Sequence, residues 1–146
     1  MRADDVQKDD VQKVVKTDEE WRAELTSEQY EVLRGHGTER PWTGEYVSVK
    51  DDGRYRCAAC GNELFDAGTK FESGTGWPSF WDAVRPDAVR LIEDRAYGMV
   101  RTEVRCARCD SHLGHLFDDG PAPTGQRYCM NSLALTLDRQ AGAPSA

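Results

Sequence analysis

The spacing of apolar positions divides this chain into a short helical part and a longer part with alternating pattern. In the first part, two short apolar stretches each follow a threonine that stands three residues before Glu or Gln, the spacing of a capping box. These pairs are Thr17 with Glu20 and Thr26 with Gln29. Gly35 then suits the end of the second stretch. The pattern predicts two short helices, over 18–24 and 27–34.

Further along, apolar residues recur at every second position in short segments separated by Gly, Asp and Pro. The clearest segments are 55–57, 100–106 and 133–137. Such alternation is typical of antiparallel strands. If 127–137 forms one strand, Arg127, Cys129 and Asn131 share a face with the leucines that follow, unless a bulge near Asn131 resets the register.

The 146 residues fit one domain, which we place at 17–140 and expect to be mainly β with short N-terminal helices. Residues 1–16 are polar and contain the pentamer Asp-Asp-Val-Gln-Lys twice in tandem, at 4–8 and 9–13. A repeat this short builds no repeat architecture, so we expect a mobile tail. Residues 141–146 have no apolar periodicity and are expected to fray.

Charge and apolar content narrow the choice of partners and compartment. The net charge of -7 works against binding to nucleic acid, because such affinity depends on Lys and Arg that neutralise phosphates. The N-terminus lacks the apolar region of a signal peptide, and no stretch approaches the roughly 18 apolar residues of a membrane span. We therefore expect a cytoplasmic protein, in which paired cysteines favour metal or redox chemistry over structural disulfides.

Four of the five cysteines form two Cys-x-x-Cys pairs. The pairs are Cys57 with Cys60 and Cys106 with Cys109. Each pair can direct two sulfurs to one point, and the residue that follows, Gly61 or Asp110, tolerates a left-handed turn. Together they predict a tetrahedral zinc site whose four sulfurs leave no open position, so the metal would be structural. The alternatives are metal-free thiols that are buried or redox-active, and a rival ligand set of Cys106, Cys109, His112 and His115.

The fifth cysteine, Cys129, lies in Arg127-Tyr128-Cys129-Met130-Asn131 and is left free for chemistry. A thiol with an ordinary pKa of about 8.5 is only a few per cent thiolate at pH 7, so a reactive cysteine needs a nearby cation or hydrogen-bond donors. Arg127 and a histidine could supply them. The alternative is an inert cysteine of the core.

Two further segments carry candidate chemistry. His112 and His115 follow the second cysteine pair and suit proton donation at neutral pH, or a purely structural role. The segment Gly74-Thr75-Gly76-Trp77-Pro78-Ser79-Phe80-Trp81 combines glycines with aromatic residues. It suits either a turn capped by core aromatics or a loop that presents a ring to an apolar S-methyl group.

Three motifs, taken with the cysteine pairs, resemble one known family. They are Gly76-Trp77-Pro78-Ser79-Phe80, Ser111-His112-Leu113-Gly114-His115 with Asp118-Asp119-Gly120-Pro121, and Arg127-Tyr128-Cys129-Met130-Asn131. In this order the chain resembles the type B methionine-R-sulfoxide reductases, from about Leu25 to about Leu137. The resemblance implies twisted antiparallel sheets packed as a β-tent, with the zinc site distant from a catalytic thiol.

The resemblance also implies roles for single residues. Cys129 would attack the sulfoxide sulfur and become a sulfenic acid. His112, His115 and Asn131 would line the site and assist protonation of the departing oxygen, and Arg127 would favour the thiolate. Trp77 would receive the methyl group, with Phe80 as the second substrate-binding aromatic residue.

Many members of this family carry a recycling cysteine two residues before the loop tryptophan, where this chain has Thr75. With the other cysteines assigned to zinc, we expect regeneration by an external thiol, from thioredoxin, glutaredoxin with glutathione, or a small reductant. The expected substrates are oxidised proteins that bear methionine-R-sulfoxide, with the free amino acid sulfoxide as the alternative. Two other functions compete: a non-catalytic, zinc-stabilised protein-binding module, and a thiol-disulfide oxidoreductase that uses a Cys-x-x-Cys pair.

Overall fold

The computed structural model describes residues 13–95 and 98–139. At its N-terminal end, the Lys13 ammonium donates to the Ala107 carbonyl and the Val14 N–H donates to the Arg108 carbonyl, each over 2.7 Å. The chain is thus attached to the fold before residue 17, where the domain was predicted to start. Apart from Lys13, the pentamer repeat lies outside the described residues, as does the predicted fray at 141–146.

Two short helices, α1 (Asp18–Glu24) and α2 (Ser27–Leu33), begin where the capping boxes predict. The side chains of Thr17 and Thr26 each accept a hydrogen bond from the backbone N–H three residues later, and the acidic or amide side chain there bonds back. Both predicted helices are confirmed. None of the described helices is long and apolar enough to cross a membrane.

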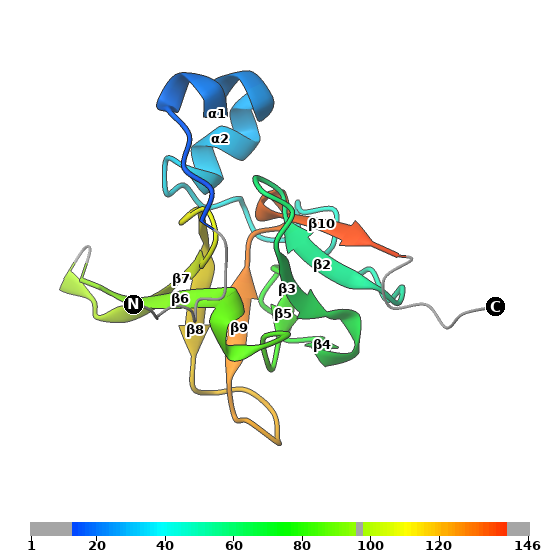
Figure 1. Ribbon diagram of the computed structural model, residues 1–146. Helices are drawn as coiled ribbons and strands as arrows, with labels where there is room; N and C mark the ends of the chain where they lie inside the picture. The colour runs from blue at the N-terminus through cyan, green and yellow to red at the C-terminus, as the bar shows by residue number, and fades with distance from the viewer. Residues whose placement is uncertain (1–12, 96–97, 140–146) are drawn as a thin grey trace, which may run out of the picture.

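The described strands form two antiparallel sheets (Figure 1). The three-stranded sheet has the order β10 (Leu135–Asp138), β2 (Arg54–Cys57), β3 (Glu63–Asp66). The six-stranded sheet has the order β4 (Lys70–Phe71), β5 (Ser79–Phe80), β9 (Arg127–Met130), β8 (His112–Phe117), β7 (Arg101–Cys106), β6 (Val89–Asp94). Short 3-10 turns connect strands at η1 (Ala67–Thr69), η2 (Pro86–Ala88) and η4 (Ser132–Ala134). The mainly β fold class is confirmed.

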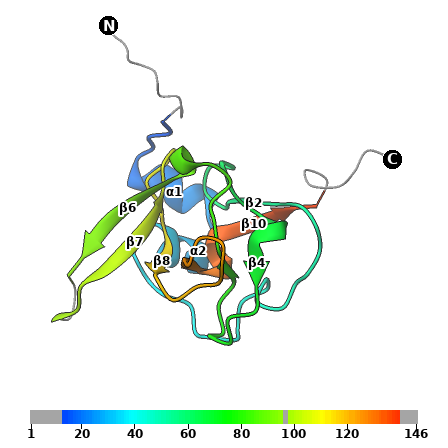
Figure 2. The same ribbon diagram turned by 90° about the horizontal axis from the view of Figure 1, so that it is seen from below.

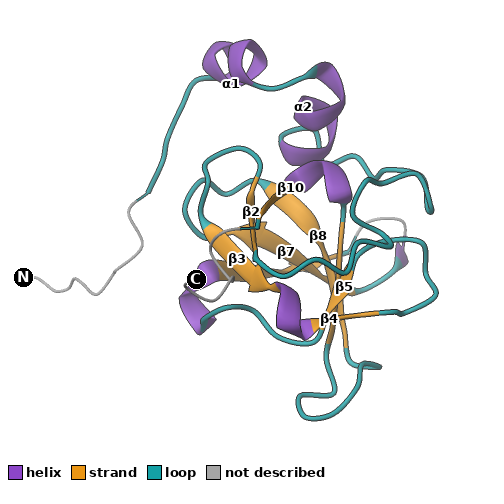
Figure 3. Ribbon diagram, turned by 90° about the vertical axis from the view of Figure 1, so that its right-hand side faces the viewer, coloured by secondary structure: helices purple, strands orange, loops and turns teal. Residues whose placement is uncertain are grey.

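Aromatic side chains join the two sheets. Phe65 on β3 stacks on Phe80 of β5 with ring centroids 4.5 Å apart, and the Tyr55 ring of β2 meets Phe80 edge-on at 5.1 Å. Such pairs bury large apolar areas in a fixed geometry. The helices lie at one end of the sheets, where buried Trp21 and Leu33 extend the core (Figure 3).

The segment 127–137 is not one strand, contrary to one prediction. Strand β9 ends at Met130, and the 3-10 turn η4 separates it from β10. This break resets the alternation, which the predicted bulge alternative also anticipated. Tyr128 and Met130 therefore face the core, whereas Cys129 is half-buried on the opposite face of the sheet.

Candidate active site and metal centre

The four predicted metal ligands meet at one point. The sulfurs of Cys57, Cys60, Cys106 and Cys109 all lie within 4.8 Å of one another. Two of the separations, Cys57 to Cys109 and Cys60 to Cys106, are 3.7 and 3.6 Å. A tetrahedral zinc ion with Zn–S bonds of about 2.3 Å requires sulfurs about 3.8 Å apart. The donor set therefore fits a structural zinc ion.

Each cysteine pair is shaped by the same backbone turn. Gly61 and Asp110, the residues after the pairs, have φ angles of +82° and +66°, as the sequence predicts. Their N–H groups each donate over 2.8 Å to the carbonyl of the first cysteine of the pair, Cys57 or Cys106. The repeated geometry turns two sulfurs of each pair toward the shared point.

The chemistry of the donor set also favours a cation. Close contact with the sulfurs of Cys106 and Cys109, together with burial, raises the pKa of Cys57 well above its usual range. A divalent metal would remove this barrier to ionisation of the Cys57 thiol, because a thiol that coordinates a metal ionises readily. The rival ligand set is contradicted, since among the described residues the sulfurs of Cys106 and Cys109 cluster with those of Cys57 and Cys60, without either histidine.

A row of residues crosses the six-stranded sheet at the centre of the candidate site. Cys129 on β9 lies directly between Ser79 on β5 and His115 on β8, and His115 in turn lies opposite Glu103 on β7. Directly opposed residues in antiparallel strands project from the same face. Residues 79, 129, 115 and 103 therefore share one face.

This register explains why Phe80 does not reach the site. Phe80 lies opposite Tyr128, one position along from the Ser79–Cys129 pair, so its side chain points to the other face of the sheet. It is 0% exposed and packs in the core against Phe65. The prediction that Phe80 contacts substrate is thus at odds with its position.

Most of the other predicted catalytic and substrate-binding residues line a cavity of about 280 Å³. Its lining includes Cys129, His115, Asn131, Arg127, Trp77 and Thr75. His112 lies behind this wall, 3% exposed, with its ring centroid 5.5 Å from that of His115. Apart from Phe80, the predicted catalytic and substrate-binding residues converge on this cavity.

Opposing effects act on the pKa of the Cys129 thiol. Burial raises its pKa above the usual value, while Thr75 and the Arg127 guanidinium act in the lowering direction and offset only part of this effect. Thr75 Oγ1 lies 3.9 Å from the Cys129 sulfur. In the free protein the neutral thiol is therefore the favoured form at neutral pH.

Arg127 is held in place by a residue that the sequence interpretation did not assign. Its guanidinium donates to both Asp119 carboxylate oxygens, over 2.8 and 3.2 Å. It also lies over the Phe117 ring, 4.4 Å from the centroid. Asp119 stands in a quoted motif, but only the fold of the loop between β8 and β9 brings it to Arg127.

Both histidines are backed by carboxylates that sequence reasoning missed. His112 Nδ1 lies 2.8 Å from Glu103 Oε2, and His115 Nε2 lies 2.9 Å from Asp94 Oδ2. Burial lowers the pKa of His112, and Glu103 offsets only part of that shift. His112 is therefore mainly neutral at pH 7. Glu103 and Asp94 lie on the two strands of the β6–β7 hairpin, which precedes the histidines in the sequence and in which no local motif marks either residue.

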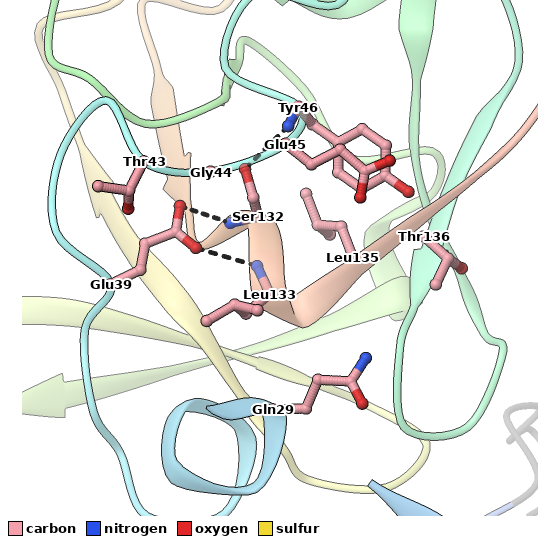
Figure 4. Close-up of a pocket in the computed structure, with 10 residues that line it drawn as sticks. All are labelled: Gln29, Glu39, Thr43, Gly44, Glu45, Tyr46, Ser132, Leu133, Leu135 and Thr136. Atoms are coloured by element: carbon pink, nitrogen blue, oxygen red, sulfur yellow. Dashed lines mark hydrogen bonds between the residues drawn. The ribbon is translucent and has the colours of Figure 1, made fainter. Parts of the chain in front are cut away.

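A loop around Glu39 fixes the far wall of the cavity. The Asn131 side chain accepts from the Glu39 N–H over 3.0 Å and donates to the Leu113 carbonyl over 3.1 Å. The Trp77 indole N–H donates to the Glu39 carbonyl over 3.0 Å. In a neighbouring pocket, the Glu39 carboxylate caps the N–H groups of Ser132 and Leu133 (Figure 4). Glu39 thus orients two predicted site residues, a role that the sequence interpretation did not assign to it.

Comparisons with known proteins show the family to which the chain belongs. The profile of the SelR domain matches residues 25–139. A peptide methionine sulfoxide reductase MsrB of Leifsonia xyli subsp. xyli is 64% identical over 123 residues, which cover 84% of this chain and 88% of the relative. The protein of the same name from Methanosarcina mazei is 59% identical over 128 residues, covering 88% and 91%. The chain therefore belongs to the SelR domain family, the family of the type B peptide methionine sulfoxide reductases.

Proposed function

We propose that this protein reduces methionine-R-sulfoxide in oxidised proteins to methionine, with Cys129 as the nucleophile and zinc as the structural metal. The observation that carries the proposal is the position of the Cys129 thiol, which lines a cavity directly opposite His115 in the paired strands β9 and β8. Family membership supports the reaction class. Geometry supports the choice of residue, because Cys129 is the one cysteine outside the four-sulfur cluster.

The reaction requires a soft nucleophile and an acid together. The Cys129 sulfur attacks the sulfoxide sulfur while the oxygen accepts a proton, since the unprotonated oxygen leaves poorly. The net change converts the thiol and the sulfoxide into a cysteine sulfenic acid and a thioether. The S–S bond formed by the attack and the S–O bond of the sulfoxide both break, and an S–O bond forms on Cys129. The thiol proton ends on the sulfenic oxygen, and two electrons pass from the Cys129 sulfur to the sulfoxide sulfur.

The cavity wall suits these demands. His115 faces the cavity beside the thiol and is the proposed proton donor, with the neutral His112 ring packed behind it. Asn131 and Arg127 supply further hydrogen-bond donors to the polarised S–O group. Trp77 presents an aromatic surface for the methyl group, because sulfur-linked methyl groups pack favourably on such rings.

Separated sulfoxide epimers test the proposal directly. The zinc-loaded protein with dithiothreitol is expected to convert a peptide with methionine-R-sulfoxide and to leave the S epimer unchanged, because one chiral arrangement of oxygen, methyl group and chain fits the cavity. Chromatography of the products measures both rates. Equal conversion of the two epimers, or conversion of neither, would contradict the proposal, and the second result would favour a non-catalytic binding module.

Regeneration of the thiol is the second part of the proposal. Thr75 replaces the recycling cysteine of many relatives, and the remaining cysteines belong to the metal cluster. We infer that an external thiol reduces the sulfenic acid, with thioredoxin or glutaredoxin and glutathione as the expected partners in a cytoplasmic setting.

Turnover in the absence of reductant should leave Cys129 as a sulfenic acid. After one equivalent of methionine-R-sulfoxide, a sulfenic-acid reagent followed by mass spectrometry is expected to label Cys129. The matched variant Thr75→Cys is expected to form a disulfide with Cys129 instead, because the two side chains already lie 3.9 Å apart. An abundant Cys129 disulfide in the wild-type chain would refute external regeneration.

A further inference from the structure

Asp94 links the edge of the six-stranded sheet to the cavity. It ends β6, the outermost strand, and its carboxylate lies 2.9 Å from Nε2 of His115. The β6–β7 hairpin extends from one side of the molecule (Figure 2). Asp94 therefore reaches His115 across strand β7, which lies between β6 and β8.

The opposing strand holds this carboxylate in position. Arg101 on β7 is the direct partner of Asp94 in the strand register, and its guanidinium lies 3.3 Å from the same oxygen that contacts His115. Both charged side chains are largely shielded from solvent: the Asp94 side chain is 22% exposed and the Arg101 side chain 31%. Ion pairs that are partly buried and that share a hydrogen-bond network restrict side-chain rotation more than exposed pairs do.

The contact has a chemical consequence for His115. An ionised carboxylate can only accept hydrogen bonds, so Nε2 must carry the proton in this contact. The other ring nitrogen, Nδ1, is then the one left for the substrate. The two nitrogens of an imidazole are not equivalent, and the partner of one determines the role of the other.

We propose that Asp94 is a positioning residue that keeps His115 in the Nε2–H tautomer and fixes the orientation of its ring toward the cavity. This inference rests on the proposed function, in which His115 protonates the sulfoxide oxygen. In this tautomer Nδ1 is unprotonated, so it accepts the proton of the Cys129 thiol as the sulfur attacks, and the same proton is then delivered from Nδ1 to the sulfoxide oxygen. Asp94 itself does not line the cavity.

The second histidine provides an internal contrast. Glu103 makes the corresponding contact with His112, also with an arginine, Arg105, on the same carboxylate oxygen. His112 is buried and does not line the cavity, whereas His115 does. The Asp94 contact is thus the one that acts on a ring with access to substrate.

Nitrogen NMR tests the positioning role without relying on turnover. Long-range ¹H–¹⁵N spectra of the zinc-loaded full chain should show His115 as the Nε2–H tautomer. In Asp94→Ala we expect a mixture of both tautomers. The spectrum of Glu93→Ala, which removes the exposed neighbouring carboxylate on the same strand, should match that of the wild type. An unchanged Nε2–H tautomer in Asp94→Ala would overturn the inference.

Kinetics test whether Asp94 acts through His115. Asp94→Ala should lower kcat/KM for a methionine-R-sulfoxide peptide by about 10- to 100-fold, as expected for a misplaced catalytic group, and Glu93→Ala should have no effect. In a His115→Gln background, Asp94→Ala should cause no further loss, measured in single turnovers. Independent, multiplicative losses in the double variant would refute the inference.

Different results would reject His115 as the proton donor and Asp94 as its positioning residue. Full activity in His115→Gln would reject His115 as the proton donor, whatever the NMR spectra show. A large loss in His115→Gln with none in Asp94→Ala would leave the proposed function intact and reject only the role of Asp94. If Asp94→Ala does not fold, Asp94→Val replaces it in both tests, because its side chain fills more of the space and cannot accept a hydrogen bond from His115.

Discussion

Cys129→Ser is expected to abolish turnover, with a loss in kcat on the order of 10³-fold or more. Serine keeps the size of the side chain, but its hydroxyl is a far weaker nucleophile and cannot accept oxygen to form a sulfenic acid. The half-buried side chain makes no contact with the metal cluster. The free energy of unfolding of the variant should therefore lie within about 1 kcal/mol of the wild-type value. The loss is measured with a methionine-R-sulfoxide peptide and dithiothreitol.

Two controls make this result specific to the chemistry. The variant must retain one metal ion per chain and the thermal transition of the wild type, so that the loss cannot come from misfolding. Thr75→Ser, which keeps the hydroxyl beside the thiol, should retain most of the activity. Substantial turnover in Cys129→Ser would remove the basis of the proposed mechanism and would direct attention to another thiol.

Loss of the metal should have the largest effect on stability. Structural zinc sites contribute apparent free energies of about 10–16 kcal/mol in small domains, whereas whole domains are stable by only about 5–15 kcal/mol. The four ligands join β2 to the β7–β8 turn, two segments in different sheets. Cys106→Ser, or prolonged chelation, is therefore expected to abolish the cooperative thermal transition or to lower Tm by more than about 20 °C.

Circular dichroism and metal analysis check this prediction together. The expected wild-type content is one zinc ion per chain, with loss of zinc and loss of the transition occurring in parallel. Cys129→Ser is the matched control, because it also removes a single thiol yet should leave both readings unchanged. A chain that stays folded and active after complete removal of the metal would show that the four sulfurs serve another purpose.

Local sequence signals predicted the elements whose interactions are local. The capping boxes at Thr17 and Thr26 fixed both helix starts, and the Cys-x-x-Cys pairs with Gly61 and Asp110 fixed the metal turns. These features depend on residues within three or four positions of one another. Their geometry therefore follows from the sequence without knowledge of the fold.

Other features depend on contacts between distant residues and escaped prediction. The carboxylate of Glu39, more than 90 positions away, caps the turn that interrupts 127–137, so strand alternation alone gave the wrong register. Phe80 was misplaced because its face depends on which residue opposes Cys129. Asp94 gave no local signal, since it resembles any polar residue at the end of an edge strand.

The hydroxyl of Thr75 beside Cys129 has a consequence for the lifetime of the protein. A hydroxyl cannot capture an oxidised sulfur, so in the cycle proposed above the sulfenic acid of Cys129 would wait for a reductant in a cavity open to solvent. During this interval a peroxide can drive it to the sulfinic state, from which ordinary thiols do not rescue it. Under the proposed mechanism, the number of repairs that one molecule completes would therefore depend on the relative rates at which reductant and peroxide reach Cys129.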